Sequence, residues 1–337
     1  MKKAVLLINL GSPNKPSILS VWRYLRQFLM DYRVIDIPYL IRLFLVNIII
    51  IPFRVKNSAK EYKKLWKIFG ESPLIKYTKS LTKKLNDKYS SKYEFYYAMR
   101  YQNPSIDKAL EEIYLENYDE LIILPLYPQY ASASSGSTIE YCNKKINNWW
   151  NFPKITIINH FYNHKSYINC FIENTKKFNI ENYNHVLFSF HGLPERHVDK
   201  TYTNNSLCKD NDCEYGVVNE NKYCYKAMCY ETTKLIAKEL SLNDENYSVT
   251  FQSRLDDKWL KPYTDTELMK LAKTGKSKVL IISPAFVSDC LETIIEISQI
   301  NKAEFINMGG KELNLVPSLN DNDNWVDSIF EIIESNA

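Results

Sequence analysis

Glycine is scarce in this chain, with only eight glycines among 337 residues. No two of them are separated by a single residue, so the G-x-G-x-x-G loop that holds a dinucleotide pyrophosphate is absent. The chain also lacks the G-x-x-x-x-G-K-[ST] loop of P-loop NTPases and the G-x-S-x-G turn that presents a catalytic serine. These absences exclude the commonest sequence routes to a dinucleotide enzyme, a nucleoside triphosphatase and a serine esterase.

Long hydrophobic runs and a secretion signal are also missing. The apolar run over residues 4–9 is too short for a signal-peptide core, and no small-residue cleavage site follows it. The longest apolar stretch, residues 37–53, is interrupted by two prolines, an arginine and an asparagine. It therefore falls short of the roughly 20 apolar residues that a spanning helix needs. We predict a cytoplasmic protein without a transmembrane helix, in which structural disulfides among the seven cysteines are rare.

Positive charge is concentrated at the start of the chain, although the net charge is only +4. Residues 1–70 carry 13 Lys and Arg against 3 Asp and Glu. This imbalance suits an anionic partner such as a carboxylated ligand, a phosphate or a membrane surface, while its alternative is a solvated helix face. We predict no nucleic-acid partner.

The apolar stretch 37–53 has two interpretations. One is a core helix. The other is an exposed apolar lip near residues 37–56, flanked by Arg33, Arg42 and Arg54, that touches lipid or a flat apolar ligand. The second interpretation predicts peripheral membrane contact.

Short apolar runs alternate with segments of helical spacing, which predicts an α/β fold with parallel sheets covered on both faces. The length suits about two domains. Because the pattern starts again near residue 185, we predict two similar Rossmann-like lobes, residues 1–160 and 161–337. The predicted strands are Ala4–Asn9, Glu94–Met99, Glu120–Leu124, Ile155–Asn159, Val186–Phe190, Ser248–Gln252 and Val279–Ser283.

A histidine follows one of these strands directly. In doubly wound sheets, ligands bind beyond the carboxyl ends of the strands, and His191 comes immediately after Val186–Phe190. An imidazole there can ligate a metal or accept protons near neutral pH. The alternative is a capping or core histidine.

Three acidic residues follow the strand Val279–Ser283. Glu292 and Glu296 are four residues apart and share a helix face, and Asp289 lies on nearly the same face. Such a row could pass a divalent cation along, or it could be a solvated face. The second interpretation is weakened because Leu291, Ile294 and Ile295 already define a separate buried face.

Six short motifs occur in an order that resembles the ferrochelatase family over nearly the whole chain. Each motif alone is a weak signal, but six in register are specific. They are Asn9–Pro13 (NLGSP), Leu126–Tyr130 (LYPQY), Ser189–Pro194 (SFHGLP), Phe251–Arg254 (FQSR), Trp259–Asp265 (WLKPYTD) and Phe286–Thr293 (FVSDCLET).

The resemblance implies insertion of Fe²⁺ into protoporphyrin IX to give protoheme, with the active site in a cleft between the two lobes. It implies that His191 accepts pyrrole protons or holds the metal, and that Glu292 completes the metal site or relays protons. Asp289, Cys290 and Glu296 are further metal candidates. The implied porphyrin contacts are Tyr127, Arg100, Tyr101, Ser132, Trp259, Phe286 and Arg33.

Two positions depart from the family pattern. Many relatives have histidine where this chain has Cys290, so the metal side of the site differs in detail. The acidic row of many relatives continues one turn past Glu296, where this chain has Ile300. A metal path that uses the third carboxylate therefore cannot operate here.

Four cysteines gather in a predicted insertion over residues 200–230. Their spacing is C-x4-C-x10-C-x4-C, and four thiolates in a reducing compartment favour a metal over disulfides. Zinc and an iron–sulfur cluster both fit four cysteines. The segment resembles the insertion of a bacterial subset of ferrochelatases that hold a [2Fe–2S] cluster, which we favour over structural Zn²⁺. The four are Cys208, Cys213, Cys224 and Cys229.

Three alternatives stay open at this stage. The nearest is a coproporphyrin III ferrochelatase or another tetrapyrrole chelatase. A second is a non-enzymatic four-cysteine protein that stores or senses metal. A hydrolase that uses His191 and Gly192 in an oxyanion loop is remote, because no nucleophile turn is present.

Overall fold

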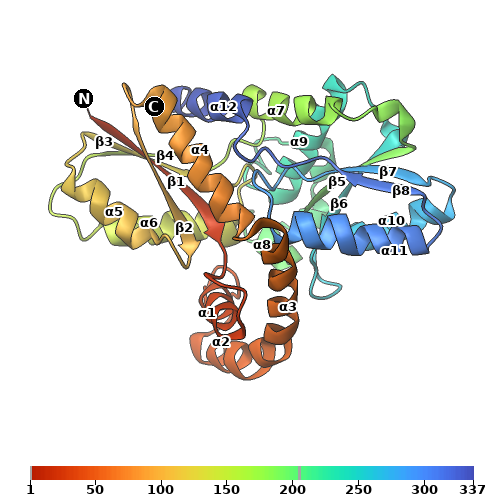
Figure 1. Ribbon diagram of the computed structural model, residues 1–337, viewed down its shortest axis with the longest axis horizontal. Coiled ribbons are helices and arrows are strands. Elements are labelled where there is room, and N and C mark those ends of the chain that lie inside the picture. Colours follow the sequence, from red (N-terminus) through yellow and green to blue (C-terminus); the bar gives the residue numbers. More distant parts are fainter. Residues whose placement is uncertain (1, 204–205) are drawn as a thin grey trace. The chain divides into compact units, whose positions relative to one another are not determined.

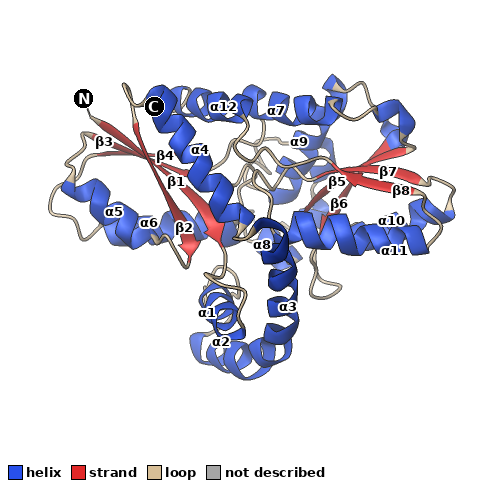
Figure 2. Ribbon diagram, in the orientation of Figure 1, coloured by secondary structure: helices blue, strands red, loops and turns tan. Residues whose placement is uncertain are grey.

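The computed structural model describes residues 2–203 and 206–337, and it divides them into two compact units. The first unit comprises Met1–Tyr127, Ser132–His160 and Asp321–Ala337. The second comprises Pro128–Ala131 and Phe161–Asn320. Each unit has its own four-stranded parallel sheet covered by helices, which confirms the predicted α/β class (Figures 1 and 2).

The sheet of the first unit has the strand order β2-β1-β3-β4. Its central strand β1 is buried from Ala4 to Ile8, because Val, Leu and Ile side chains meet helices on both faces. The strands are β1 (Lys3–Gly11), β2 (Glu94–Tyr101), β3 (Glu120–Pro125) and β4 (Lys154–Ile157). The helices are α4 (Pro73–Tyr89), α5 (Ile106–Leu115), η2 (Ser132–Gly136), α6 (Ser137–Ile146) and α12 (Asp323–Glu334).

A helical arm of the first unit extends away from this sheet (Figure 1). It consists of α1 (Ile18–Leu29), α2 (Tyr39–Phe44), the π-helix η1 (Leu45–Ile50) and α3 (Ile51–Phe69). The helices α1 and α3 contact each other, and α3 ends at Gly70, which adopts a left-handed conformation with φ 75°. The residues of the predicted apolar lip therefore form the tip of a helical arm.

The sheet of the second unit has the strand order β6-β5-β7-β8, so β5 and β7 lie in the middle. The strands are β5 (His185–His191), β6 (Tyr247–Gln252), β7 (Lys278–Ile282) and β8 (Glu312–Leu315). The longer helices are α7 (Lys165–Lys176), α9 (Tyr225–Glu239), α10 (Thr264–Lys273) and the π-helix η7 (Glu292–Asn301), which continues into α11 (Lys302–Asn307). Short helical turns are η3 (Ile180–Asn182), α8 (Glu195–Asp199), η4 (Cys208–Asp210), η5 (Cys213–Tyr215) and η6 (Asp244–Asn246).

All seven predicted strands are present, and their ends differ from the prediction by at most two residues. The eighth strand, β8, was not predicted; it has four residues, of which only Leu313 is buried. The sequence assigned residues 321–337 to the second lobe, whereas they pack with the first unit. The reason is that the apolar face of α12 packs against α4.

Over the described part of the chain, no helix combines the length and apolar character that crossing a membrane requires.

Candidate active site

Three adjacent strands of the second unit end beside one another and carry the candidate residues. His191 is the last residue of β5, and its register partner Gln252 is the last residue of β6. The π-helix η7, which begins at Glu292, follows the other neighbour of β5, strand β7. Because parallel strands present their carboxyl ends at one sheet edge, the predicted histidine and the predicted acids belong to the same edge.

The His191 side chain is half-buried, and one of its ring nitrogens is engaged by the backbone. Nδ1 lies 2.6 Å from the carbonyl oxygen of Gly192, which can only accept a hydrogen bond. In the neutral ring the proton is therefore on Nδ1, and Nε2 keeps the lone pair. This tautomer can accept a proton or ligate a metal through Nε2.

Gly192 holds the turn after β5 close to its neighbours. Its amide donates to the carbonyl oxygen of Gln252 at 2.7 Å. A Cβ at position 192 would lie 2.8 Å from that oxygen and 3.3 Å from Cε3 of Trp259. Only glycine fits without displacing the Gln252 carbonyl. Because residue 192 is glycine, the Trp259 ring can pack against the residue that follows His191.

A second aromatic ring lies beside the histidine. The ring centroids of Phe286 and His191 are 6.3 Å apart, with an angle of 58° between the planes. Phe286 and Trp259 are both half-buried. The structure therefore brings together three of the predicted site residues, His191, Trp259 and Phe286.

The three acids do not form a uniform row. Asp289 is buried and accepts hydrogen bonds from Asn320 Nδ2 at 2.8 Å and from Thr293 Oγ1 at 3.0 Å. Glu292 and Glu296 are partly exposed on η7, and Glu296 accepts a hydrogen bond from Ser253 Oγ at 2.8 Å. Asp289 is therefore held in an internal network, whereas Glu292 and Glu296 remain the carboxylates that a metal can reach.

Cys290 lies between these acids and is fully enclosed. Burial raises the pKa of its thiol well above the usual value, and the neighbouring Glu292 carboxylate raises it further. At neutral pH the side chain is therefore a neutral thiol. Because a metal-bound cysteine is a thiolate, Cys290 would have to lose this proton to act as a metal ligand.

The comparison with known proteins settles the family. The sequence profile described as Ferrochelatase matches residues 2–337. The chain belongs to the ferrochelatase family. A ferrochelatase of Coxiella burnetii (strain CbuK_Q154) is 41% identical over 98% of this chain and 93% of its own length. A ferrochelatase of Legionella pneumophila (strain Philadelphia 1) is 40% identical over 99% of both chains.

A solved structure has a similar fold. The structure of SirB from Bacillus subtilis with Fe³⁺ matches with a TM-score of 0.56 and 11% sequence identity. The match covers 100% of this chain and 96% of that one. At this identity the likeness concerns the α/β fold alone and no individual residue.

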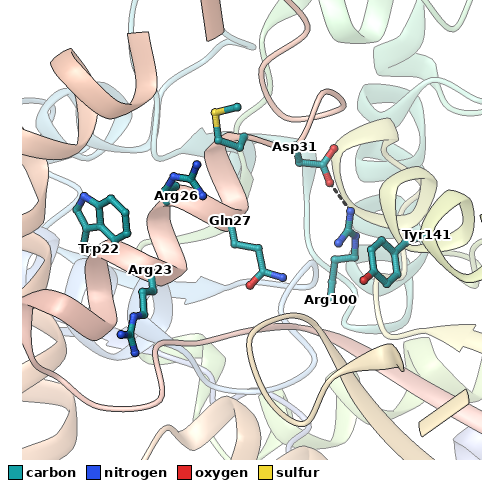
Figure 3. Close-up of a pocket in the computed structure, with 8 residues that line it drawn as sticks. Trp22, Arg23, Arg26, Gln27, Asp31, Arg100 and Tyr141 are labelled. Carbon is teal, nitrogen blue, oxygen red and sulfur yellow. Dashed lines mark hydrogen bonds and ion pairs between the residues drawn. The ribbon is translucent and has the colours of Figure 1, made fainter. Parts of the chain in front are cut away.

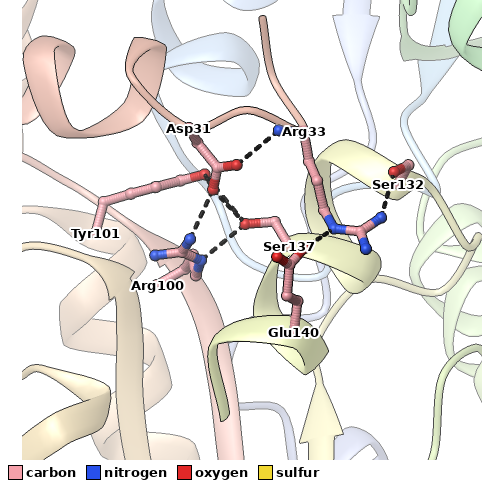
Figure 4. A network of polar contacts seen from close by, with 7 residues as sticks. All are labelled: Asp31, Arg33, Arg100, Tyr101, Ser132, Ser137 and Glu140. Atoms are coloured by element: carbon pink, nitrogen blue, oxygen red, sulfur yellow. Dashed lines mark hydrogen bonds and ion pairs between the residues drawn. The ribbon is translucent and has the colours of Figure 1, made fainter. Parts of the chain in front are cut away.

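The predicted porphyrin contacts of the first unit centre on one carboxylate (Figure 4). Asp31 accepts hydrogen bonds from Arg100 at 2.6 Å, from Tyr101 at 2.9 Å, from Ser137 at 2.5 Å and from the Arg33 amide at 2.8 Å. Burial raises the pKa of the Tyr101 phenol well above its usual value, so the phenol stays a donor. Arg100 and Tyr101 are thus bonded internally.

Arg33 and Ser132 form a second, more open pair. Arg33 bonds to Ser132 Oγ at 2.9 Å and forms an ion pair with Glu140, which is exposed (Figure 4). The Arg33 guanidinium can therefore exchange an exposed carboxylate for one on a ligand. Tyr127 directly precedes this region, and burial raises the pKa of its phenol.

An open pocket of about 410 Å³ is lined in part by the paired side chains of Asp31 and Arg100 (Figure 3). Arg23 and Arg26 reach it from α1, while Arg100 reaches it from β2. The pocket therefore offers positive charge beside aromatic side chains. Its lining residues are Trp22, Arg23, Arg26, Gln27, Met30, Asp31, Arg100 and Tyr141.

Three of the four predicted cysteines lie together in the second unit. The sulfur atoms of Cys208, Cys213 and Cys224 are 3.5–3.8 Å apart, and all three side chains are buried. Thiolates at about 2.3 Å around a tetrahedral Zn²⁺ lie roughly 3.8 Å from one another, so this spacing fits sulfurs that share a metal. The residues present therefore fit a thiolate-held metal.

Cys229 does not belong to this group of three. It lies one turn along α9 from Tyr225, where burial raises the pKa of its thiol well above the usual value. The spacing and the resemblance predicted all four cysteines as ligands of one metal group. The spacing carried no information on which way each side chain points.

Several residues of the site were not predicted. Asp31 and Ser137 organise the first-unit network, and Tyr225 contacts His191 in the second unit. Ser253 lies in the motif Phe251–Arg254, but no role was predicted for it. In the structure its φ is 63°, which is uncommon for a residue other than glycine. These contacts join residues far apart in the sequence, so no local pattern indicates them.

Proposed function

We propose that this chain inserts Fe²⁺ into protoporphyrin IX to give protoheme, the last step of heme synthesis, and releases two protons. The observation that carries the proposal is the position of His191, at the carboxyl end of β5, in a chain that matches the ferrochelatase family over residues 2–337. Its Nε2 lone pair has the character that the reaction needs in a proton acceptor.

The chemistry follows from the charges involved. Four N–Fe bonds form: two pyrrole nitrogens lose their protons as they bind the metal, and the other two bind it through lone pairs that carry no proton. His191 accepts these protons at Nε2 or holds the incoming ion, and Glu292 completes the metal site or relays protons outward. Glu296, held by Ser253, is the next carboxylate along η7. Imidazole and carboxylate ligands bind Fe²⁺ weakly enough to pass it on, which a cage of thiolates would not do.

The aromatic and basic residues have separate tasks in this proposal. Trp259, Phe286 and Tyr127 pack against the macrocycle, which presents a flat apolar face. Arg33 and Ser132 bind a propionate carboxylate through charge-assisted hydrogen bonds. Arg100 and Tyr101 support them by fixing Asp31, which accepts a hydrogen bond from the Arg33 amide.

We also propose that the cysteine segment holds a [2Fe–2S] cluster. The spacing of the three thiols supports a metal there, and the cluster requires Cys229 as the fourth thiolate. The insertion reaction transfers no electrons, so a group at this site has a structural or iron-sensing role. Equal amounts of iron and acid-labile sulfide after anaerobic purification support the cluster, while one zinc and no sulfide support structural Zn²⁺ instead.

The exposed side chains at the tip of the helical arm support the proposal that the protein contacts a membrane surface peripherally. Phe53 is 79% exposed and Leu40 75% exposed, and Phe44 and Ile48 lie on the same α2–η1–α3 segment. Exposed Arg54 and Lys56 accompany them. Apolar side chains beside cations suit the headgroup region of an anionic bilayer, where an apolar dianion such as protoporphyrin is available.

An anaerobic assay with ferrous iron tests the proposal. Protoporphyrin IX fluorescence should fall as heme forms, and the same assay with coproporphyrin III should be slower. Faster turnover of coproporphyrin III would change the substrate, and failure with both porphyrins would overturn the whole proposal. A protein that only stores or senses metal would lose its function in Cys224→Ser but not in His191→Ala.

A further inference from the structure

Tyr225 contacts the backbone of the proposed catalytic histidine from a different element. It is the first residue of α9 and is buried, and its hydroxyl donates to the main-chain carbonyl oxygen of His191 at 3.0 Å. Burial raises the pKa of this phenol well above its usual value, so the hydroxyl keeps its proton. The contact fixes the end of β5 at the residue whose ring must be aimed.

The residue before Tyr225 belongs to the thiol group. Cys224 is the N-cap of α9, and its sulfur accepts a hydrogen bond from the Ala227 amide at 3.5 Å. The same sulfur lies 3.7 Å from Cys208 and 3.5 Å from Cys213. The start of α9 is therefore fixed by the thiol group on one side and by His191 on the other.

One further contact joins the same regions. The Cys208 amide donates to Asp199 Oδ1 at 2.8 Å, and Asp199 ends the short helix α8 that begins four residues after His191. The cysteine segment is thus connected to the end of β5 in two ways. The backbone route runs along the chain from His191 to Asp199, which bonds to Cys208, and the side-chain route is the Tyr225 hydroxyl.

We propose that Tyr225 is a positioning residue that couples the metal state of the thiol group to the orientation of His191. The inference rests on the proposed function of His191. In this proposal the metal ion joins Cys208 on η4 and Cys213 on η5 to Cys224. Removal of the metal therefore loosens the start of α9. Since a hydrogen bond weakens steeply beyond about 3.2 Å, a shift of about 1 Å at the start of α9 releases the His191 carbonyl.

Hydrogen exchange measures this coupling without any turnover. The full-length protein is compared before and after a chelator removes its thiol-bound metal, in wild type, in Tyr225→Phe and in the control Tyr230→Phe. The Gly192 amide, which donates to Gln252, reports the end of β5. We expect exchange over residues 188–194 to speed up on metal removal in wild type and in Tyr230→Phe. In Tyr225→Phe it should be fast already and change little.

Kinetics give a second, independent readout. Loss of one hydrogen bond predicts that Tyr225→Phe lowers kcat roughly fivefold, with an unchanged KM for protoporphyrin and full metal content. Metal removal should lower kcat in wild type but add little in the variant, because both changes break the same link. Asp199→Asn, which weakens the backbone route, should add to the effect of Tyr225→Phe.

The outcomes separate the coupling from the proposed function. If wild type inserts no iron, the proposed function fails, while the exchange experiment still tests the coupling. If exchange over residues 188–194 responds equally to metal removal in Tyr225→Phe and in wild type, the coupling is overturned. The same holds if Tyr230→Phe reproduces the effects of Tyr225→Phe.

Discussion

Asp31 is the residue on which the first-unit network depends. Its carboxylate accepts hydrogen bonds from three side chains and one amide, and its side chain is 8% exposed against 12% for Arg100. A charged pair so well buried is costly to leave incomplete, because the remaining charge has lost its water. The network therefore fixes the backbone that carries Arg33.

Asp31→Asn tests this dependence. We expect the free energy of unfolding of the first unit to fall by about 3 kcal/mol, because Arg100 keeps its charge without a carboxylate partner. Denaturant titration followed by intrinsic fluorescence measures the change. The control is Asp107→Asn, which breaks the more exposed pair with Lys145 and should cost less than about 1 kcal/mol. Equal losses in the two variants would refute the account.

Gly192 is the second residue whose replacement has a defined cost. In Gly192→Ala the new Cβ must push away the Gln252 carbonyl or the Trp259 ring, which lie 2.8 Å and 3.3 Å from it. We expect kcat for iron insertion to fall about tenfold or more, since misplacement by about 1 Å near reacting groups costs up to a hundredfold. Wild-type kcat in a variant that is folded by circular dichroism would show that the turn tolerates the shift.

The helical arm carries exposed apolar side chains beside positively charged side chains. Replacing Phe44 and Phe53 by glutamate should weaken binding to vesicles that contain anionic lipid about tenfold or more, because two apolar anchors are lost and two repulsive charges appear. Vesicle co-sedimentation at two salt concentrations measures this. Phe152→Glu is the control, since Phe152 is 60% exposed, as is Phe44, but lies outside the arm. Similar losses in both proteins would contradict a specific role of the arm.

The elements also show what the sequence can and cannot predict. Strands such as β1 and β5 were predictable because parallel strands buried on both faces read as continuous apolar runs. The π-helix η7 was read as an ordinary helix, because a wider turn leaves no mark in residue spacing. The candidate site at the end of β5 was predicted from the place of His191 directly after a strand and from the family motifs. The partners that hold it, such as Tyr225, were not found, because tertiary contacts bring them from distant positions.

The free energy of unfolding of the whole protein should depend on the protonation of His185, the first residue of β5. Burial and the positive charges of Lys276 and Lys270 lower its pKa to about 4. Its Nε2 lies 2.9 Å from Ser248 Oγ, and Lys276 lies 3.2 Å from Nδ1, which suits a neutral ring. Between pH 6.5 and 4 the unfolded chain binds this proton and the folded chain does not.

The free energy of unfolding should therefore fall as the pH drops through this window, by up to about 1.4 kcal/mol per pH unit from this group alone. The contribution is fully present above pH 6.5. Denaturant titrations at several pH values, in wild type and in His185→Gln, measure the difference. Parallel pH dependence of the two proteins would show that His185 is not the responsible group.

In the proposed reaction, the His191 imidazole and the Glu292 carboxylate act together on the metal ion and the macrocycle. The most direct test is kcat for iron insertion into protoporphyrin IX by His191→Ala, Glu292→Gln and the double variant, with His164→Ala as control. We predict a loss of about 100-fold or more in each single variant, little further loss in the double variant, and wild-type kcat in the control. Wild-type kcat in either single variant, or fully multiplicative losses in the double variant, would contradict the account.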